Sequence, residues 1–131
     1  NNMFVKIPSI KENVSVVESF IENVGEKIKI EDSIYGNVLV SVTEAVNNAI
    51  VHGNKENKNK KIRLALKQNK KSVRFVVEDE GLGFDFDNLP DPTNPKNIEK
   101  VKGRGIFLIR SLSDKTTFKH GGRTVEMLFK L

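Results

Sequence analysis

The sequence predicts an α+β domain, a two-layer α/β sandwich in which helices cover one face of a mixed, mostly antiparallel sheet. Three segments carry apolar residues at helical spacing, and short β-rich runs bounded by turn residues lie around them. The predicted order is β, α, α, β, β, α, β, β, which favours hairpins with the helices segregated on one side. With 131 residues, the chain is expected to form a single domain over residues 1–131.

The first half of the chain predicts a strand followed by two helices. Residues 3–8 alternate weakly and form a short strand, and residues 11–29 form an amphipathic helix with Phe20 or Ile21 on its buried side. Asp32 or Ser33 is expected to cap the second helix at its start, and Gly53 to cap its end. Residues 54–59 form a polar linker.

The second half predicts two hairpins separated by a long loop and a helix. Residues 61–67 and 72–79 form the first hairpin, and residues 116–119 and 124–131 form the last one around a turn at 120–123. Residues 84–102 contain three prolines and little periodicity, which favours a mobile functional loop. Gly103-Arg104-Gly105 is expected to open the third helix, over residues 106–112.

Composition excludes several classes of function. There is no cysteine, so the chain has no disulfide, thiol nucleophile or thiolate metal site, and the presence of only two histidines disfavours a zinc site. No apolar run approaches the roughly 20 residues that span a bilayer, and no signal peptide precedes the first strand, so we expect a cytoplasmic protein. The net charge is +5, but the basic residues around 55–71 have no interleaved aromatic residues, so we expect no direct nucleic-acid binding. An acidic protein partner remains open.

A polar strip runs along the second helix. Asn37, Ser41, Glu44 and Asn48 fall together at about 100° per residue, roughly opposite the apolar face. Such a strip alone is typical of a solvated surface. The flanking apolar residues Val40 and Val51 instead favour a strip covered by a second surface or by a ligand.

Two glycine-rich clusters could contact a ligand. Asp79-x-Gly81-x-Gly83 follows a β-run, where a carboxylate could accept a hydrogen bond from an exocyclic amine such as that of adenine, although an ordinary Asp/Gly turn has the same pattern. Gly103-x-Gly105 precedes a helix whose first amides would favour an anion, and the alternative is a simple linker. Neither the third glycine of a Rossmann fingerprint nor a P-loop is present.

Together these clusters resemble, in order and spacing, the ATP-binding boxes of the gyrase, heat-shock chaperone, histidine-kinase and mismatch-repair ATPase (GHKL) superfamily, which has the Bergerat-type ATP-binding fold. Glu44 to Gly53 resembles its asparagine box, and the two glycine clusters resemble its glycine boxes. Within that superfamily the chain is most similar to the bacterial anti-sigma-factor serine kinases of the RsbW and SpoIIAB type. The segment from Asp85 to Thr93 and the ending Gly121-Gly122-Arg123-Thr124-Val125 carry this closer resemblance.

The resemblance implies an anti-sigma factor that uses ATP and Mg²⁺ to phosphorylate a serine or threonine of an anti-anti-sigma antagonist, binds a sigma factor, and forms a homodimer. Glu44 would be the catalytic base, Asn48 the Mg²⁺ ligand and Asp79 the adenine-selecting residue. Residues 84–102 would form a lid. The other implied nucleotide contacts are Asn47, Gly81, Gly83, Gly103, Arg104, Gly105 and Thr124.

Two other functions stay open. One is a non-catalytic regulator that binds ATP as a structural ligand, although the presence of Glu44 favours phosphotransfer. The other is a stand-alone catalytic domain of a histidine kinase, which would need a separate acceptor chain. No dimerising helical segment with a phosphoacceptor fits the sequence, and we expect His52 and His120 to be structural or exposed.

Overall fold

The computed structural model describes residues 2–83 and 101–131. The strands are β1 (Asn2–Pro8), β2 (Lys61–Gln68), β3 (Ser72–Glu78), β4 (Lys115–Lys119) and β5 (Thr124–Lys130), and the α-helices are α1 (Val14–Ile28), α2 (Asp32–Asn48) and α3 (Val101–Leu112). Short 3-10 helices lie at Lys11–Asn13 and His120–Gly122, and a π-helical turn at Ala49–Gly53 extends α2. The predicted lid lies mostly outside the described residues.

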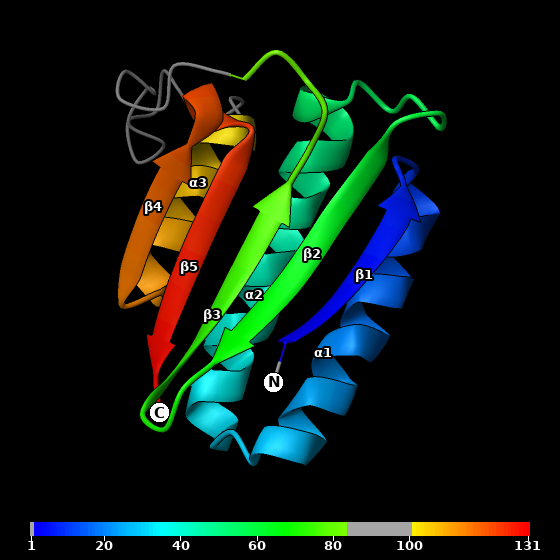
Figure 1. The fold of residues 1–131 in the computed structure, drawn as a ribbon. Coiled ribbons are helices and arrows are strands. Elements are labelled where there is room, and N and C mark those ends of the chain that lie inside the picture. The colour runs from blue at the N-terminus through cyan, green and yellow to red at the C-terminus, as the bar shows by residue number, and fades with distance from the viewer. Residues whose placement is uncertain (1, 84–100) are drawn as a thin grey trace.

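The five strands form one sheet in the order β1-β2-β3-β5-β4, and every neighbouring pair is antiparallel. The α+β sandwich is therefore confirmed, but within the described residues the sheet is fully antiparallel rather than mixed. The connections explain the direction of the strands. Helix α1 leads the chain away from the end of the sheet at which β1 finishes, and α2 leads it back to that same end. Strand β2 therefore starts where β1 ends and runs in the opposite direction (Figure 1).

All three helices lie on one face of the sheet, and α2 lies between α1 and α3 (Figure 1). The core fills the space between these two layers. Alternate residues of the three central strands point into it because successive side chains of a strand face opposite sides. These buried residues are Ile62, Leu64 and Leu66 of β2, Val73, Phe75 and Val77 of β3, and Val125, Met127 and Phe129 of β5. Burying each such side chain stabilises the fold by about 1.5–3 kcal/mol.

Several predicted element ends are wrong. The N-cap of α2 is Glu31, without a side-chain cap hydrogen bond, so neither Asp32 nor Ser33 caps the helix. Of the two alternatives predicted for the buried side of α1, Phe20 and Ile21, Ile21 is the fully buried residue, so that prediction is confirmed. Gly53 is not a left-handed cap either, because the positive φ angles come at Lys55 and Glu56.

The third helix begins earlier than predicted. Because α3 starts at Val101, Gly103 and Gly105 lie inside the helix and not ahead of it. The argument that these glycines expose the free amides of a helix N-terminus is therefore wrong. None of the helices in the described ranges is both long enough and apolar enough to cross a membrane.

Candidate functional site

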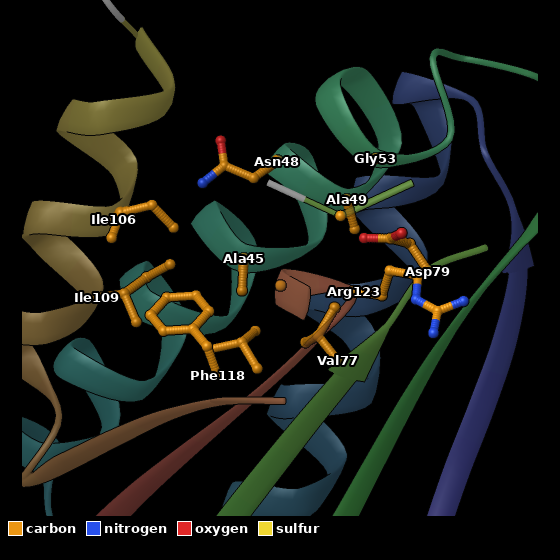
Figure 2. A pocket seen from close by; sticks show the side chains of 13 residues that line it. Ala45, Asn48, Ala49, Gly53, Val77, Asp79, Ile106, Ile109, Phe118 and Arg123 are labelled. Atoms are coloured by element: carbon orange, nitrogen blue, oxygen red, sulfur yellow. The ribbon is translucent and has the colours of Figure 1, made fainter. Parts of the chain in front are cut away.

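A cavity opens where the C-terminal end of α2, the face of α3 and the ends of β3 and β5 meet. The cavity and its mouth together enclose about 420 Å³ of non-atom space, which includes open solvent. Figure 2 shows Ile106, Ile109 and Phe118 on one side of it and Asp79 with Arg123 on the other. The remaining lining residues are Ala45, Asn48, Ala49, Gly53, Val77, Gly83, Gly122 and Val125. A mostly apolar cavity with a few polar groups suits a flat heterocycle that carries an amine.

Asp79 is held at this cavity by the chain on both sides of it. It directly follows β3, and its backbone N–H donates to the carbonyl of Arg123 at 2.9 Å, one residue before β5. The N–H of Gly81 then donates to Asp79 Oδ1 at 2.8 Å. Gly81, the first glycine of the first glycine box, therefore holds the carboxylate in a fixed position at the cavity wall.

Glycine is required where the π-helical turn meets the turn after β3. A Cβ atom at Gly53 would overlap the carboxylate of Asp79, and one at Gly81 would overlap the carbonyl of Gly53. Gly83 has φ +84°, and a Cβ there would overlap the carbonyl of Gly121. The asparagine box and the first glycine box are therefore in direct contact, although they are distant in the sequence. The role of Gly53 is this close approach and not the termination of α2.

Asn54 also stabilises the contact between the π-helical turn and the turn after β3. Its side chain is 1% exposed. Its Oδ1 accepts from the N–H of Glu80 at 2.7 Å, and its Nδ2 donates to Ser9 Oγ at 2.7 Å and to the carbonyl of Lys61 at 3.0 Å. Asn54 was predicted to lie in a polar linker, because an asparagine after a helix gives no sign that it will be buried. It instead joins three separate segments beneath Asp79.

The C-terminal part of the polar strip on α2 faces α3. A Cβ atom at Gly105 would lie 2.9 Å from Asn48 Nδ2 and 3.0 Å from Glu44 Oε2, so both side chains reach the same point of α3. Ser41, on the same strip, is completely buried. The expectation that a second surface covers this strip is confirmed for its C-terminal part, whereas Asn37 and the flanking Val40 are exposed. Glycine at position 105 leaves the space that Glu44 and Asn48 occupy.

Asn48 is a buried side chain whose hydrogen bonds are not satisfied by the protein. It is 8% exposed, and neither Oδ1 nor Nδ2 has a partner within the described residues. A buried polar group without a partner costs about 1–3 kcal/mol, so a ligand that supplies partners is favoured here. The described residues contain no cluster of three or more histidine, aspartate, glutamate or cysteine side chains that could hold a metal alone. Mg²⁺ fits nevertheless, since it commonly takes one or two protein oxygens together with phosphate oxygens and water.

The other predicted site residues are less closely associated with the cavity. Asn47 is half-buried and Arg104 is exposed, and neither lines it. Thr124 is buried, and its Oγ1 lies 3.0 Å from His120 Nδ1, on the side of β5 opposite to Val125. Arg123 lines the cavity instead. Nothing in the sequence distinguishes Arg123 from other basic turn residues, so it was not predicted.

Known proteins share this sequence pattern and fold. The profile of the histidine kinase-like ATPase domain matches residues 7–129. Serine-protein kinase RsbW from Staphylococcus aureus strains JH9 and Newman is 29% identical over 131 residues, which covers 94% of this chain and 82% of the relative. The crystal structure of the RsbU and RsbW domains of Rv1364c from Mycobacterium tuberculosis has a TM-score of 0.69 at 15% identity and shows the same fold. That match covers 99% of this chain and 32% of the other.

The family match spans nearly the whole chain and includes the asparagine box, the first glycine box and α3. The resemblance to RsbW-type kinases that the motifs predicted is confirmed. This chain therefore belongs to the histidine kinase-like ATPase domain family.

Proposed function

We propose that this chain is an anti-sigma regulator of the RsbW type that binds ATP with Mg²⁺ and phosphorylates a serine or threonine of an anti-anti-sigma antagonist. It would also sequester a sigma factor or similar target. The observation that carries the proposal is the side-chain amide of Asn48, which has no hydrogen-bond partner among the described residues. Asn48 and Glu44 both lie next to Gly105, and Asn48 lines the same cavity as Asp79. The relatives named serine-protein kinase RsbW support the choice of reaction.

The cavity supports recognition of adenine. Asp79 can accept a hydrogen bond from the exocyclic amine of the base, while Ile106 and Phe118 offer apolar surface to the ring. The N–H of Gly81 already binds Asp79 Oδ1, so one carboxylate oxygen is engaged by the protein. A base that presents a carbonyl oxygen instead of the amine would leave a lone pair facing the carboxylate, which disfavours guanine.

The placement of Glu44 and Asn48 beside Gly105 supports phosphotransfer. Asn48 Oδ1 would hold the Mg²⁺, and the ion, once bound, would neutralise charge on the phosphate oxygens. The acceptor hydroxyl oxygen forms a bond to the γ-phosphorus while the bond from that phosphorus to the bridging oxygen of ADP breaks. The hydroxyl proton passes to the carboxylate of Glu44, which lies one helical turn from Asn48 and faces the same point of α3.

Replacing Glu44 by glutamine tests this assignment. Glu44→Gln keeps the size and polarity of the side chain but removes its basicity, so we expect ATP·Mg affinity within about twofold and phosphotransfer reduced by about 10²–10⁴-fold. Transfer from labelled ATP to the antagonist and calorimetric ATP titration measure the two effects. Asn48→Ala should instead weaken ATP·Mg binding itself. The matched control is Glu22→Gln, at an exposed position of α1.

The outcomes separate the candidate functions. Normal transfer by Glu44→Gln would remove Glu44 from the role of base. A wild-type chain that binds ATP and transfers no phosphate to any acceptor hydroxyl would be the non-catalytic regulator. Transfer to a histidine of a separate chain would indicate a histidine-kinase catalytic domain. The homodimer implied by the resemblance stays a prediction, which sedimentation of the purified chain measures.

A further inference from the structure

The face of the sheet opposite the helices is strongly basic. We call this surface the open sheet face. It carries the side chains that alternate with the core residues along each strand. Its acidic residues are Glu78 and Glu126, and its basic residues include Lys6, Arg63, Lys67, Arg74, Lys115 and Lys119. Lys61 and Lys130 share this face by the same alternation, so eight cations against two carboxylates give it an excess of positive charge.

The strand register brings like charges together on this face. Lys6 lies directly opposite Arg63 across β1 and β2, and Lys67 lies directly opposite Arg74 across β2 and β3. Like charges in directly opposed positions destabilise a sheet. Across the next two strands, Arg74 lies opposite Leu128 of β5, and Leu128 lies opposite Lys115 of β4. The fold therefore maintains two unfavourable pairs on a single surface, which an anionic partner would convert into favourable contacts.

The carboxylates of this face are already engaged. Glu126 lies 2.6 Å from Lys119 Nζ and 3.5 Å from Arg74, and Glu78 lies 4.0 Å from Arg63. The hydrogen bond from Lys119 is the main reason why the pKa of Glu126 is lowered, so this carboxylate is ionised and its charge is already compensated. No ion pair is found for Lys67 within the described ranges of the chain. The excess positive charge is therefore available to a partner.

The basic side chains surround shallow hollows. One hollow of about 470 Å³, open to solvent, is lined by Arg74, Lys115, Thr117, Lys119, Glu126 and Leu128. A second hollow of about 360 Å³ beside it shares Arg74 and Leu128 and adds Lys67. Carboxylate side chains of a partner could enter both hollows. The apolar side chain of Leu128 between them offers contact to the carbon atoms of the same partner.

We propose that the open sheet face binds an acidic surface of a partner protein. Two other occupants fit less well. A second copy of this chain would bring the same excess of positive charge to the contact. Nucleic acid would use aromatic stacking, but Phe4, the aromatic residue of this face within the described strands, already lies under the guanidinium of Arg63 at 4.9 Å. Because the nucleotide cavity lies on the helix side of the sheet, the partner would leave that cavity accessible (Figure 1).

The test compares two charge reversals that change the net charge equally. The face variant is Lys67→Glu with Lys115→Glu, and the control is Lys55→Glu with Lys58→Glu in the loop before β2. Fluorescently labelled poly-L-glutamate is titrated with the full chain at 50 and 300 mM NaCl. We expect binding that weakens with salt, at least tenfold loss for the face variant and less than twofold loss for the control. Circular dichroism confirms that both variants remain folded.

Three results would overturn the proposal. Equal loss in the two variants would mean that net charge, and not this face, drives binding. Tighter binding of a labelled single-stranded oligonucleotide, lost in the face variant alone, would make the face a nucleic-acid surface. A concentration-dependent dimer in sedimentation that the face variant abolishes would assign the face to a second copy of the chain. Phosphotransfer is not part of this test, so its outcome is independent of the proposed kinase activity.

Discussion

Replacing Gly53 by alanine tests the contact on which the candidate site depends. Gly53 ends the π-helical turn after α2, and a Cβ atom there would overlap the carboxylate of Asp79. The backbone of the turn can accept alanine, since Gly53 does not have a positive φ angle. Asp79 must therefore rotate away, and its hydrogen bond from the N–H of Gly81 at 2.8 Å is lost.

The magnitude follows from two opposing contributions. Alanine stabilises a helical position by about 0.5–1 kcal/mol relative to glycine. Loss of the hydrogen bond from Gly81 to the charged carboxylate costs about 1.5–3 kcal/mol. Gly53→Ala should therefore lower the free energy of unfolding by about 0.5–2.5 kcal/mol. Displacement of Asp79 also removes its bond to the amine of adenine, which weakens ATP binding by roughly 10–150-fold.

Gly36 supplies a matched control on the same helix. A Cβ atom at Gly36 would meet nothing within 4 Å. Gly36→Ala should therefore raise the free energy of unfolding by about 0.5–1 kcal/mol and leave ATP affinity unchanged. Urea unfolding followed by circular dichroism measures stability, and calorimetric titration measures ATP·Mg affinity. Because both variants gain the same helical contribution, the difference between them isolates the contact with Asp79.

One result would refute this reasoning. If Gly53→Ala is stabilised as much as Gly36→Ala and binds ATP as tightly as the wild type, the carboxylate of Asp79 does not pack on Gly53. A loss of stability without any change in ATP affinity would keep the contact and remove Asp79 from base recognition. The stability measurement does not require ATP, so it tests the geometry even if the proposed function is wrong.

Two further substitutions test hydrogen bonds beside the site and on the sheet. Asn54→Ala removes three hydrogen bonds and leaves Ser9 Oγ without its donor. We therefore expect the free energy of unfolding in urea to fall by roughly 2–4 kcal/mol, and a loss below about 0.5 kcal/mol would contradict the network. Glu126→Gln should cost about 1 kcal/mol at neutral pH. Because the hydrogen bond from Lys119 lowers the pKa of Glu126, this difference should be fully present above the unfolded value of 4.5 and disappear as the pH falls through the folded pKa. Unfolding curves from pH 3 to pH 7 check this, and a difference that persists unchanged at pH 3 would show that charge is not its source.

The local predictions succeeded where a single physical rule governs the residue. Val73, Phe75 and Val77 alternate with polar residues, and they form one buried face of β3 because successive side chains of a strand point to opposite sides. The same rule separates two neighbouring residues at the start of β5. Thr124 Oγ1 lies 3.0 Å from His120 Nδ1 and Arg123 lines the cavity, so the predicted contact of Thr124 with the nucleotide stays a prediction.

The predicted start of α3 was wrong because of its two glycines. Gly103 and Gly105 are poor helix formers, so the sequence suggested that the helix begins after them. In the structure they lie inside the helix, and Gly105 is the place where α3 approaches Glu44 and Asn48. Packing between helices outweighs a propensity cost of about 1 kcal/mol per glycine, because a larger residue would displace both polar side chains.

The sequence by itself determined the strands and helices, their order and the motifs that identify the ATPase family, since these depend on residues close together in the chain. Only the tertiary structure decided that Asn48 is buried without a partner among the described residues, that Gly53 touches Asp79, and that Lys67 faces Arg74 across two strands. The first depends on how α2 packs against α3, the second on how the turn after α2 packs against the turn after β3, and the third on the strand register. None of these arrangements is encoded in the periodicity of one segment, because each is set by how complete segments fit against one another.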